Sequence, residues 1–382
     1  MLRSDFYYEL PQELIAQHPV EPRSASRLMK ICRETGDIEH SHFYNLCGFL
    51  KKGDLLVMND SRVIPARLYG VKEGTGAHME FLLLEQKGEK VWEILVKPGK
   101  RAKPGTRFVF GEGRLTAEIL SIAEGGNRIA QFYCDGSIYT ALDEIGQMPL
   151  PPYITEKLED KERYQTVYSR ELGSSAAPTA GLHFTPELLD EIRAAGINTA
   201  YVTLHVGLGT FRPVKEDNIL DHKMHSEPFT VTRGFLKDLV AAVDSHRVVA
   251  VGTTSTRCLE SLYYIGVQCL EHPEGVLEPV SQWEPYEREY PYTVSDSLKA
   301  LISYMEAHGM EKLVAGTSII IVPGFNYRVV DMLVTNFHQP QSTLLLLISA
   351  FIGDSWKDLY DHALENGYRF LSYGDSSLLF RG

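Results

Sequence analysis

The sequence predicts an α/β protein in which a large sheet, with helices on its faces, carries an inserted small all-β barrel. Strand-like and helix-like segments alternate on both sides of the region 62–150, which is typical of a sheet covered by helices. Within that region, short β-branched runs are separated by turns containing Gly or Pro, as in a small barrel. The prolines of "MPLPPYI" at 148–154 then block regular structure and suit a crossing between domains.

We therefore expect a discontinuous α/β catalytic domain over 1–61 and 151–382, with a barrel domain inserted over 62–150. In the α/β part, apolar runs predict strands at 54–59, 198–204, 247–252, 318–324 and 329–336. Capping residues predict helix starts at Thr185, Ser255, Ser295, Ser342 and Asp354. Barrel strands are expected at 79–86, 91–98, 106–113, 115–122 and 128–134, before a helical pattern at 139–146. The acidic, aromatic segment 270–293 is interpreted as a long loop or lid.

Composition narrows the class of protein. A hydrophobic content of 44% is enough for a substantial core. The stretch 1–14 lacks the features of a signal peptide, and the apolar run 344–352 is too short to span a bilayer, so we expect a cytoplasmic protein without membrane contact. Five cysteines, an odd number without a CxxC pair, indicate neither a disulfide framework nor a thiolate zinc site. The net charge of −12 argues against non-specific coating of nucleic acid.

One local segment is nevertheless strongly basic. The stretch "KPGKRAKPGTR" at 97–107 contains no acidic residue, and its two Pro-Gly pairs predict turns that display the charges. It is a candidate loop for contact with RNA phosphates, through Lys97, Lys100, Arg101, Lys103 and Arg107. A solvated hairpin face without specific function remains the alternative.

Polar residues follow four of the predicted strands, in the segments 60–62, 205–211, 253–257 and 337–343. In an open α/β sheet, ligands bind outside the carboxyl ends of the strands, so these segments predict one shared ligand site. The side chains that they contribute include Asp60, Arg62, His205, Thr254, Arg257, Asn336 and His338.

The stretch "SSAAPTAGLHFT" at 174–185 adds a fifth candidate segment. Its small residues allow close approach of the backbone to a ligand, and Thr185 caps a helix whose N-terminal amides favour anions. His183 is expected beside this helix start. A hydrogen-bonded histidine of the core is the alternative.

Other motifs carry less information. His222, His225 and Glu227 invite a metal interpretation, but the i, i+3 histidine spacing without a third distant ligand is poor evidence for zinc, and we expect no metal. The segment "VAVGTTSTR" lacks the GxGxxG and GxxxxGK[ST] patterns of nucleotide-binding loops, and the chain has no GxSxG motif.

Taken together, the motifs resemble one known family over essentially the whole chain. The phrases "NDSRVIPARL", "LPPYI", "AAPTAGLHFT", "VTLHVGLGTFRPV", "MHSEPF", "GTTSTRCLES" and "TNFHQPQSTLLLLISAF" are similar to those of the S-adenosylmethionine:tRNA ribosyltransferase-isomerases of queuosine synthesis. Departures are local: Gln339 stands where leucine is expected, Ser174 and Ser175 precede "AAPTAG", and the ending "YGDSSLLF" differs from the usual one.

The resemblance implies an α/β domain with an inserted barrel and an unusual use of S-adenosylmethionine. The ribosyl part of this cosubstrate is transferred to the aminomethyl group of preQ1 in a tRNA anticodon, giving epoxyqueuosine, adenine and methionine. It implies no metal or organic cofactor beyond S-adenosylmethionine, and tRNA carrying preQ1 as the partner. We expect a monomer.

This chemistry needs a base for the ribose C5′ protons next to the sulfonium, an acid for the departing adenine and a neutral attacking amine. Histidines suit these tasks near pH 7, and the pool comprises His183, His205, His225 and His338. Asp60 and Glu227 are candidates for the ammonium or ribose hydroxyls, Arg62 or Arg257 for the carboxylate, and Phe184, Phe211 or Phe337 for the sulfonium. Thr179, Thr254 and Asn336 complete the predicted substrate-binding residues.

Two other functions are compatible with the sequence. The first is an enzyme that transfers the methyl group of S-adenosylmethionine and releases S-adenosylhomocysteine. The second is a tRNA-binding protein without catalysis, which would keep its function after alanine substitution of the histidines. Analysis of the reaction products separates all three.

Overall fold

The computed structural model describes residues 1–207 and 214–381. Within them, nine strands form one mixed sheet in the order β15-β13-β12-β3-β14-β16-β17-β1-β2. Its strands are β1 (Arg27–Cys32), β2 (Ile38–His42), β3 (Leu55–Asn59), β12 (Asn198–Leu204), β13 (Glu227–Thr232), β14 (Val248–Val251), β15 (Lys312–Thr317), β16 (Met332–Asn336) and β17 (Ser376–Phe380). The central strands β12, β3, β14 and β16 run parallel to their neighbours in this group, so their carboxyl ends meet at one edge.

Strand β3 is buried on both faces of the sheet, as strands between two helical layers are. Leu55 and Val57 belong to the apolar core on one side, and the alternating Leu56 and Met58 belong to the core on the other. At the end of the strand, Asn59 donates through Nδ2 to the carbonyl oxygen of Leu204 at 2.9 Å and accepts through Oδ1 from the Leu204 N–H at 3.1 Å. The Asn59 amide thus extends the pairing of β3 with β12.

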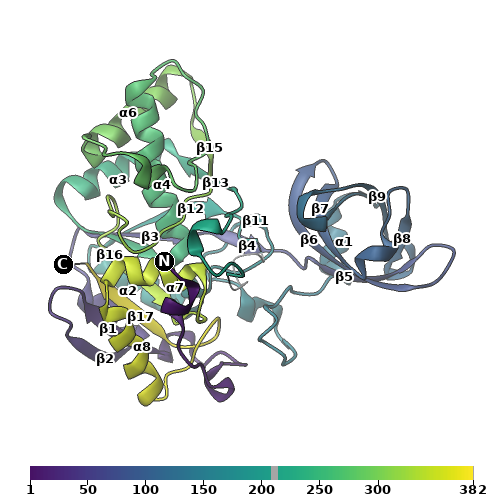
Figure 1. The fold of residues 1–382 in the computed structure, drawn as a ribbon, viewed down its shortest axis with the longest axis horizontal. Coiled ribbons are helices and arrows are strands. Elements are labelled where there is room, and N and C mark those ends of the chain that lie inside the picture. Colours follow the sequence, from purple (N-terminus) through teal and green to yellow (C-terminus); the bar gives the residue numbers. More distant parts are fainter. Residues whose placement is uncertain (208–213, 382) are drawn as a thin grey trace.

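Helices cover both faces of the sheet (Figure 1). One face packs against α2 (Pro186–Ala194) and the short helix 43–49, and the other against the larger helical layer. That layer contains α3 (Arg233–Ser245), α4 (Gly252–Glu271), α6 (Val294–Ala307), α7 (Thr343–Ile352) and α8 (Ser355–Glu365). This arrangement and the barrel described next confirm the predicted fold class.

The inserted region forms a closed barrel in the order β10-β7-β6-β5-β8-β9. Its strands are β5 (Arg67–Lys72), β6 (His78–Gly88), β7 (Val91–Lys97), β8 (Arg107–Phe110), β9 (Leu115–Ile122) and β10 (Arg128–Tyr133). Helix α1 (Ile138–Ile145) contributes apolar side chains to the same core as the inward-facing aromatics of the barrel. Figure 1 shows the barrel beside the sheet domain, with β4 (Ser61–Val63) and β11 (Glu171–Ser174) between them.

Three details of the predicted elements were wrong. Residues 318–324 form no strand; β15 ends at Thr317. The apolar run is buried, but loop and side-chain groups satisfy its backbone: Ile319 O accepts from Arg257 Nε, and Ile320 O accepts from Tyr286. Periodicity alone does not separate such a buried loop from a buried strand.

The other two errors concern helix starts. Helix α4 begins at Gly252 rather than at Ser255, and α6 is capped by Thr293 rather than by Ser295. The predicted caps at Thr185 and Ser342 are confirmed, because each hydroxyl accepts a hydrogen bond from an amide in the first turn of its helix. Helix α8 follows Asp354, as predicted.

Of the segment 270–293, the first two residues end α4, and 272–293 connect α4 to α6 and include the four-residue helix α5 (Glu284–Glu287). It packs against α4 through Tyr290, whose ring lies 5.1 Å from that of Tyr264. None of the described helices is both long and apolar enough to cross a membrane.

Candidate functional site

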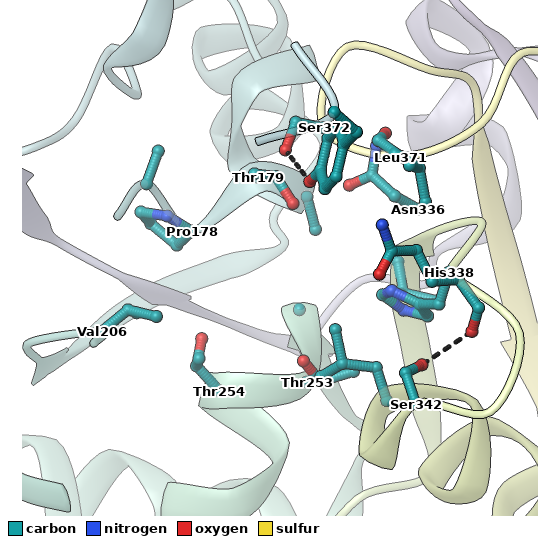
Figure 2. Close-up of a pocket in the computed structure, with 17 residues that line it drawn as sticks. Pro178, Thr179, Val206, Thr253, Thr254, Asn336, His338, Ser342, Leu371 and Ser372 are labelled. Carbon is teal, nitrogen blue, oxygen red and sulfur yellow. Dashed lines mark hydrogen bonds between the residues drawn. The ribbon is translucent and has the colours of Figure 1, made fainter. Parts of the chain in front are cut away.

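A pocket with about 620 Å³ of empty space, part of it open to solvent, lies at the carboxyl edge of the central strands. Its lining comes from the segment 177–180, from Val206 after β12, from 252–254 at the start of α4, and from 335–344 at the end of β16 and beyond it. Figure 2 shows Thr179, Thr254 and His338 around this space, each from a different part of the chain. Three of the four predicted strand-end segments therefore meet there, together with the small-residue stretch.

His338 is the histidine of the predicted pool that lines this pocket. Its Nε2 lies 2.8 Å from the hydroxyl of Thr335, and its Nδ1 has no hydrogen-bond partner among the described residues. Tyr360 accepts from the His338 N–H at 2.9 Å, and Tyr8 donates to the His338 carbonyl oxygen. Burial lowers the pKa of His338 to about 3, so its ring is neutral at pH 7.

His183 lies behind the pocket wall and is fully hydrogen-bonded within the protein. Asn336 Nδ2 donates to Nε2 of His183 at 3.1 Å and also to the carbonyl oxygen of Leu371 at 3.1 Å. Because Nε2 accepts, the ring proton is on Nδ1, which donates to Ser26 Oγ at 2.7 Å. Burial lowers the pKa of His183 to about 4, in keeping with this neutral state.

Asn336 connects this buried network to the pocket, which it lines. Both of its amide hydrogens are used, whereas its Oδ1 has no partner among the residues that the structure describes. A buried carbonyl oxygen without a partner is costly, so a donor group of a ligand would find a favourable position here.

The N-terminus of α4 forms another wall of the pocket through Gly252, Thr253 and Thr254. Gly252 has φ of +86°, a conformation that favours glycine, and the preceding Val251 provides no side-chain cap. The first amides of this 20-residue helix therefore lack intrahelical acceptors, and the helix dipole is positive at this end. The α4 wall of the pocket therefore favours binding of an anionic group of a ligand.

The predicted ionic residues lie outside the pocket lining. Arg257 and Glu227 form an ion pair in which both side chains are largely buried, and Arg257 Nε donates to the carbonyl oxygen of Ile319 at 3.1 Å. Asp60 accepts from Thr203 Oγ1 at 2.7 Å, and burial raises the pKa of its carboxyl group. Arg62, in β4 between the sheet and the barrel, pairs with Glu162.

The remaining predicted site residues are dispersed. His205 is partly buried, burial lowers its pKa, and its Nδ1 has no partner in the described part of the chain. His225 is exposed. Phe184 and Phe337 are fully buried in aromatic clusters rather than in the pocket wall. Phe211 lies outside the described residues.

The basic segment projects from the barrel between β7 and β8. Arg107 pairs with Glu118, with Nε 3.0 Å from the carboxylate. The other cations are exposed and have no ion-pair partner within 1–207 and 214–381; they are Lys97, Lys100, Arg101 and Lys103.

Sequence reasoning missed several pocket residues. Tyr153 and Ser372 both line the pocket, and their hydroxyls lie 2.7 Å apart. Tyr153 belongs to the family-like phrase "LPPYI", which could have indicated it. Ser372 follows no predicted strand, so the rule that polar residues after strands form the site could not find it. Among the described residues, no group of three or more His, Cys, Asp or Glu side chains is placed to hold a metal ion, and His222 is bonded to Glu216 at 2.9 Å.

Comparisons with known proteins agree on one family. Residues 3–379 match the family described as "Queuosine biosynthesis protein". A curated protein of Caldanaerobacter subterraneus, named S-adenosylmethionine:tRNA ribosyltransferase-isomerase, is 49% identical over 99% of this chain and 100% of its own length. A protein of the same name from Acetivibrio thermocellus is also 49% identical, over 98% of this chain and 99% of its own.

A solved structure is similar as well. The crystal structure of S-adenosylmethionine tRNA ribosyltransferase from Thermotoga maritima is 36% identical, with a TM-score of 0.50, and the match covers 98% of this chain and 100% of that one. The chain therefore belongs to the queuosine biosynthesis protein family and is an enzyme of the transferase class.

Proposed function

We propose that this enzyme transfers and isomerises the ribosyl moiety of S-adenosylmethionine onto the 7-aminomethyl group of preQ1 in tRNA. The products are epoxyqueuosine-tRNA, adenine and methionine. The coarser activity, a tRNA ribosyltransferase-isomerase of queuosine biosynthesis, follows from full-length relatives at 49% identity. The observation that carries the finer proposal is the lining of one pocket by His338 with its neutral ring, by Asn336 with an unpaired amide oxygen, and by the N-terminus of α4.

The pocket offers complementary positions for the two polar ends of S-adenosylmethionine. The first amides of α4 suit the methionyl carboxylate, because they present unpaired N–H groups at the positive end of a helix. Asn336 Oδ1 suits a donor such as the ammonium, a ribose hydroxyl or the adenine amine.

His338 is our candidate for proton transfer within the predicted pool. Its neutral ring has one nitrogen held by Thr335 and the other available to a ligand. Removal of a ribose C5′ proton and delivery of a proton to the departing adenine both need such a group. His183 has both nitrogens occupied within the protein, so in this proposal it positions Asn336 rather than touching the substrate.

The other predicted residues keep their roles as proposals. Thr179 and Thr254 line the pocket with His338, while the exposed cations of the basic segment are candidates for contact with tRNA phosphates. A monomeric, cytoplasmic enzyme without a further cofactor is part of the same proposal. Light scattering coupled to size-exclusion chromatography tests the oligomeric state.

The decisive experiment is mass spectrometry of preQ1-bearing tRNA after incubation with the enzyme and S-adenosylmethionine. An epoxyqueuosine mass with equal amounts of adenine and methionine supports the proposal. A methylated base with S-adenosylhomocysteine, or an unchanged base, contradicts it. His338→Ala should lower turnover by about 100-fold or more if its ring transfers a proton, and His225→Ala shows whether the exposed histidine contributes.

A further inference from the structure

A second, smaller pocket, with about 260 Å³ of empty space that includes open solvent, adjoins the large one. Ser372 lines both pockets. The hydrogen-bonded pair of Asn336 and His183 lies in the wall between them, with Asn336 lining the large pocket and His183 the small one. The polar lining of the small pocket also includes Arg23, Ser26, Arg163 and Tyr373.

The two arginines bring positive charge and unused hydrogen-bond donors. Arg23 donates to the carbonyl oxygens of Glu162 at 2.7 Å and Gln165 at 2.6 Å. Arg163 donates to the Val20 carbonyl oxygen at 2.8 Å and pairs with Glu21 at 3.1 Å. A guanidinium has five N–H donors, so each arginine retains donors for a ligand.

The positive charges of Arg23 and Arg163 repel each other. Burial and the neighbouring Arg163 lower the pKa of Arg23, although the carboxylates of Glu21, Asp160 and Glu162 oppose this effect. These carboxylates are exposed, and Glu162 is also paired with Arg62. An anion in the pocket would relieve the repulsion between Arg23 and Arg163.

Tyr373 gives a second, independent indication of a ligand. Only 4% of this residue is exposed, and its hydroxyl has no hydrogen-bond partner among the described residues. Burial raises the pKa of Tyr373 to about 12, against the nearby charges of Arg163 and Arg23, so the hydroxyl is a neutral donor near both. Ser26 accepts from His183, which leaves its own hydroxyl hydrogen free to donate. The polar wall is thus composed mainly of donors.

We propose that the small pocket binds a phosphate group of the RNA backbone beside the nucleotide whose base enters the large pocket. This inference rests on the proposed function. A phosphodiester offers acceptor oxygens and a negative charge, which match two arginines and two hydroxyl donors. Both arginines are partly exposed, so a polymer on the surface reaches them. The methionyl carboxylate of S-adenosylmethionine is already assigned to the α4 amides of the large pocket, so the small pocket is left for a different anion.

Tyr373→Phe is the sharpest test, because it removes a hydroxyl without a partner in the folded protein. We expect the Kd for preQ1-bearing tRNA to rise about 3- to 10-fold, while the Tm and the Kd for S-adenosylmethionine stay the same. Tyr168→Phe is the matched control, since that hydroxyl is also buried without a described partner but lines neither pocket. An unchanged affinity of Tyr373→Phe for tRNA would overturn the inference.

Arg163→Gln tests the charge. The slope of log K for tRNA against log salt should decrease by about 1, and Arg163→Lys should restore most of it. Weaker binding of S-adenosylmethionine with unchanged tRNA binding would assign the pocket to the cosubstrate carboxylate and refute the phosphate assignment. Failure of the wild-type enzyme to form epoxyqueuosine while these binding effects appear would refute only the proposed function.

Discussion

The side-chain amide of Asn336 donates at 3.1 Å to Nε2 of His183, which defines both the orientation of the amide and the tautomer of the ring. The Leu371 carbonyl oxygen accepts the other amide hydrogen. Rotation of the amide by 180° would therefore place Asn336 Oδ1, an acceptor, against the Leu371 carbonyl oxygen, another acceptor. The Asn336 side chain, which lines the pocket, is thereby held in one orientation by His183 and Leu371.

Asn336→Asp should disrupt this arrangement. The carboxylate has no hydrogens for His183 Nε2 and the Leu371 carbonyl oxygen, so two buried acceptors lose their donor. We expect the free energy of unfolding to fall by about 1–3 kcal/mol and the affinity for S-adenosylmethionine to fall as well. Urea denaturation and calorimetric titration measure the two effects. Unchanged values for both would show that the amide orientation is unimportant.

The Thr335–His338 hydrogen bond should matter for turnover more than for binding. Thr335→Val keeps the shape of the side chain but removes the group that holds Nε2 at 2.8 Å. We expect kcat to fall about 10- to 100-fold through loss of a positioned proton-transfer group, with little change in the Kd for S-adenosylmethionine. Ser349→Ala, which removes a buried hydroxyl in α7, is the control. An equal loss in both variants would contradict the prediction.

Stability should fall as the pH is lowered below about 6.5. The folded-state pKa values of His183 and His338 are lowered to about 4 and about 3, so between these values and 6.5 the unfolded chain binds more protons. Each histidine contributes up to about 1.4 kcal/mol per pH unit in that range. Denaturation curves from pH 4.5 to 7 should show a shallower dependence for His338→Gln than for the wild-type protein; parallel curves would argue against a buried neutral ring.

Glu260 should be important for the sheet domain although it lines neither pocket. Its carboxyl group, within α4, accepts from three successive backbone amides, those of Arg328, Val329 and Val330, at 2.9–3.0 Å. Glu260→Gln would turn one acceptor into a donor facing an N–H group. We expect a loss of about 1–3 kcal/mol, seen as a lower urea midpoint, and an unchanged midpoint would refute it.

Charge reversal in the basic segment should weaken tRNA binding. Lys100→Glu or Arg101→Glu removes an exposed cation without an ion-pair partner within the described residues. If each contacts a phosphate, the salt slope should decrease by about 1. Arg114→Glu makes the same charge change on the barrel, at a residue paired with Glu144, and serves as the control. An equal change of the salt slope in Arg114→Glu would indicate that tRNA responds only to the overall charge of the barrel.

The sequence was sufficient for the central strands and for four of the segments that line the pocket, because both depend on local patterns. The apolar runs of β3, β12, β14 and β16 and the polar residues after them were recognisable without a structure. The partners of His183 were not, since Ser26 and Asn336 lie 157 and 153 residues away in the chain. The same limit hid the Arg257–Glu227 ion pair, whose partners lie 30 residues apart in the chain.

The two-sided burial of β3 makes its alignment depend on the polar side chains at its ends. Leu55, Leu56, Val57 and Met58 are all apolar, so sliding the strand by one residue would exchange the two cores with little change in buried apolar area. Asn59 fits its paired contacts with Leu204 at a single position. Its loss would therefore leave the alignment of β3 to the contacts of Asp54 with Arg247 at the other end of the strand, and the pocket is complete in only one alignment.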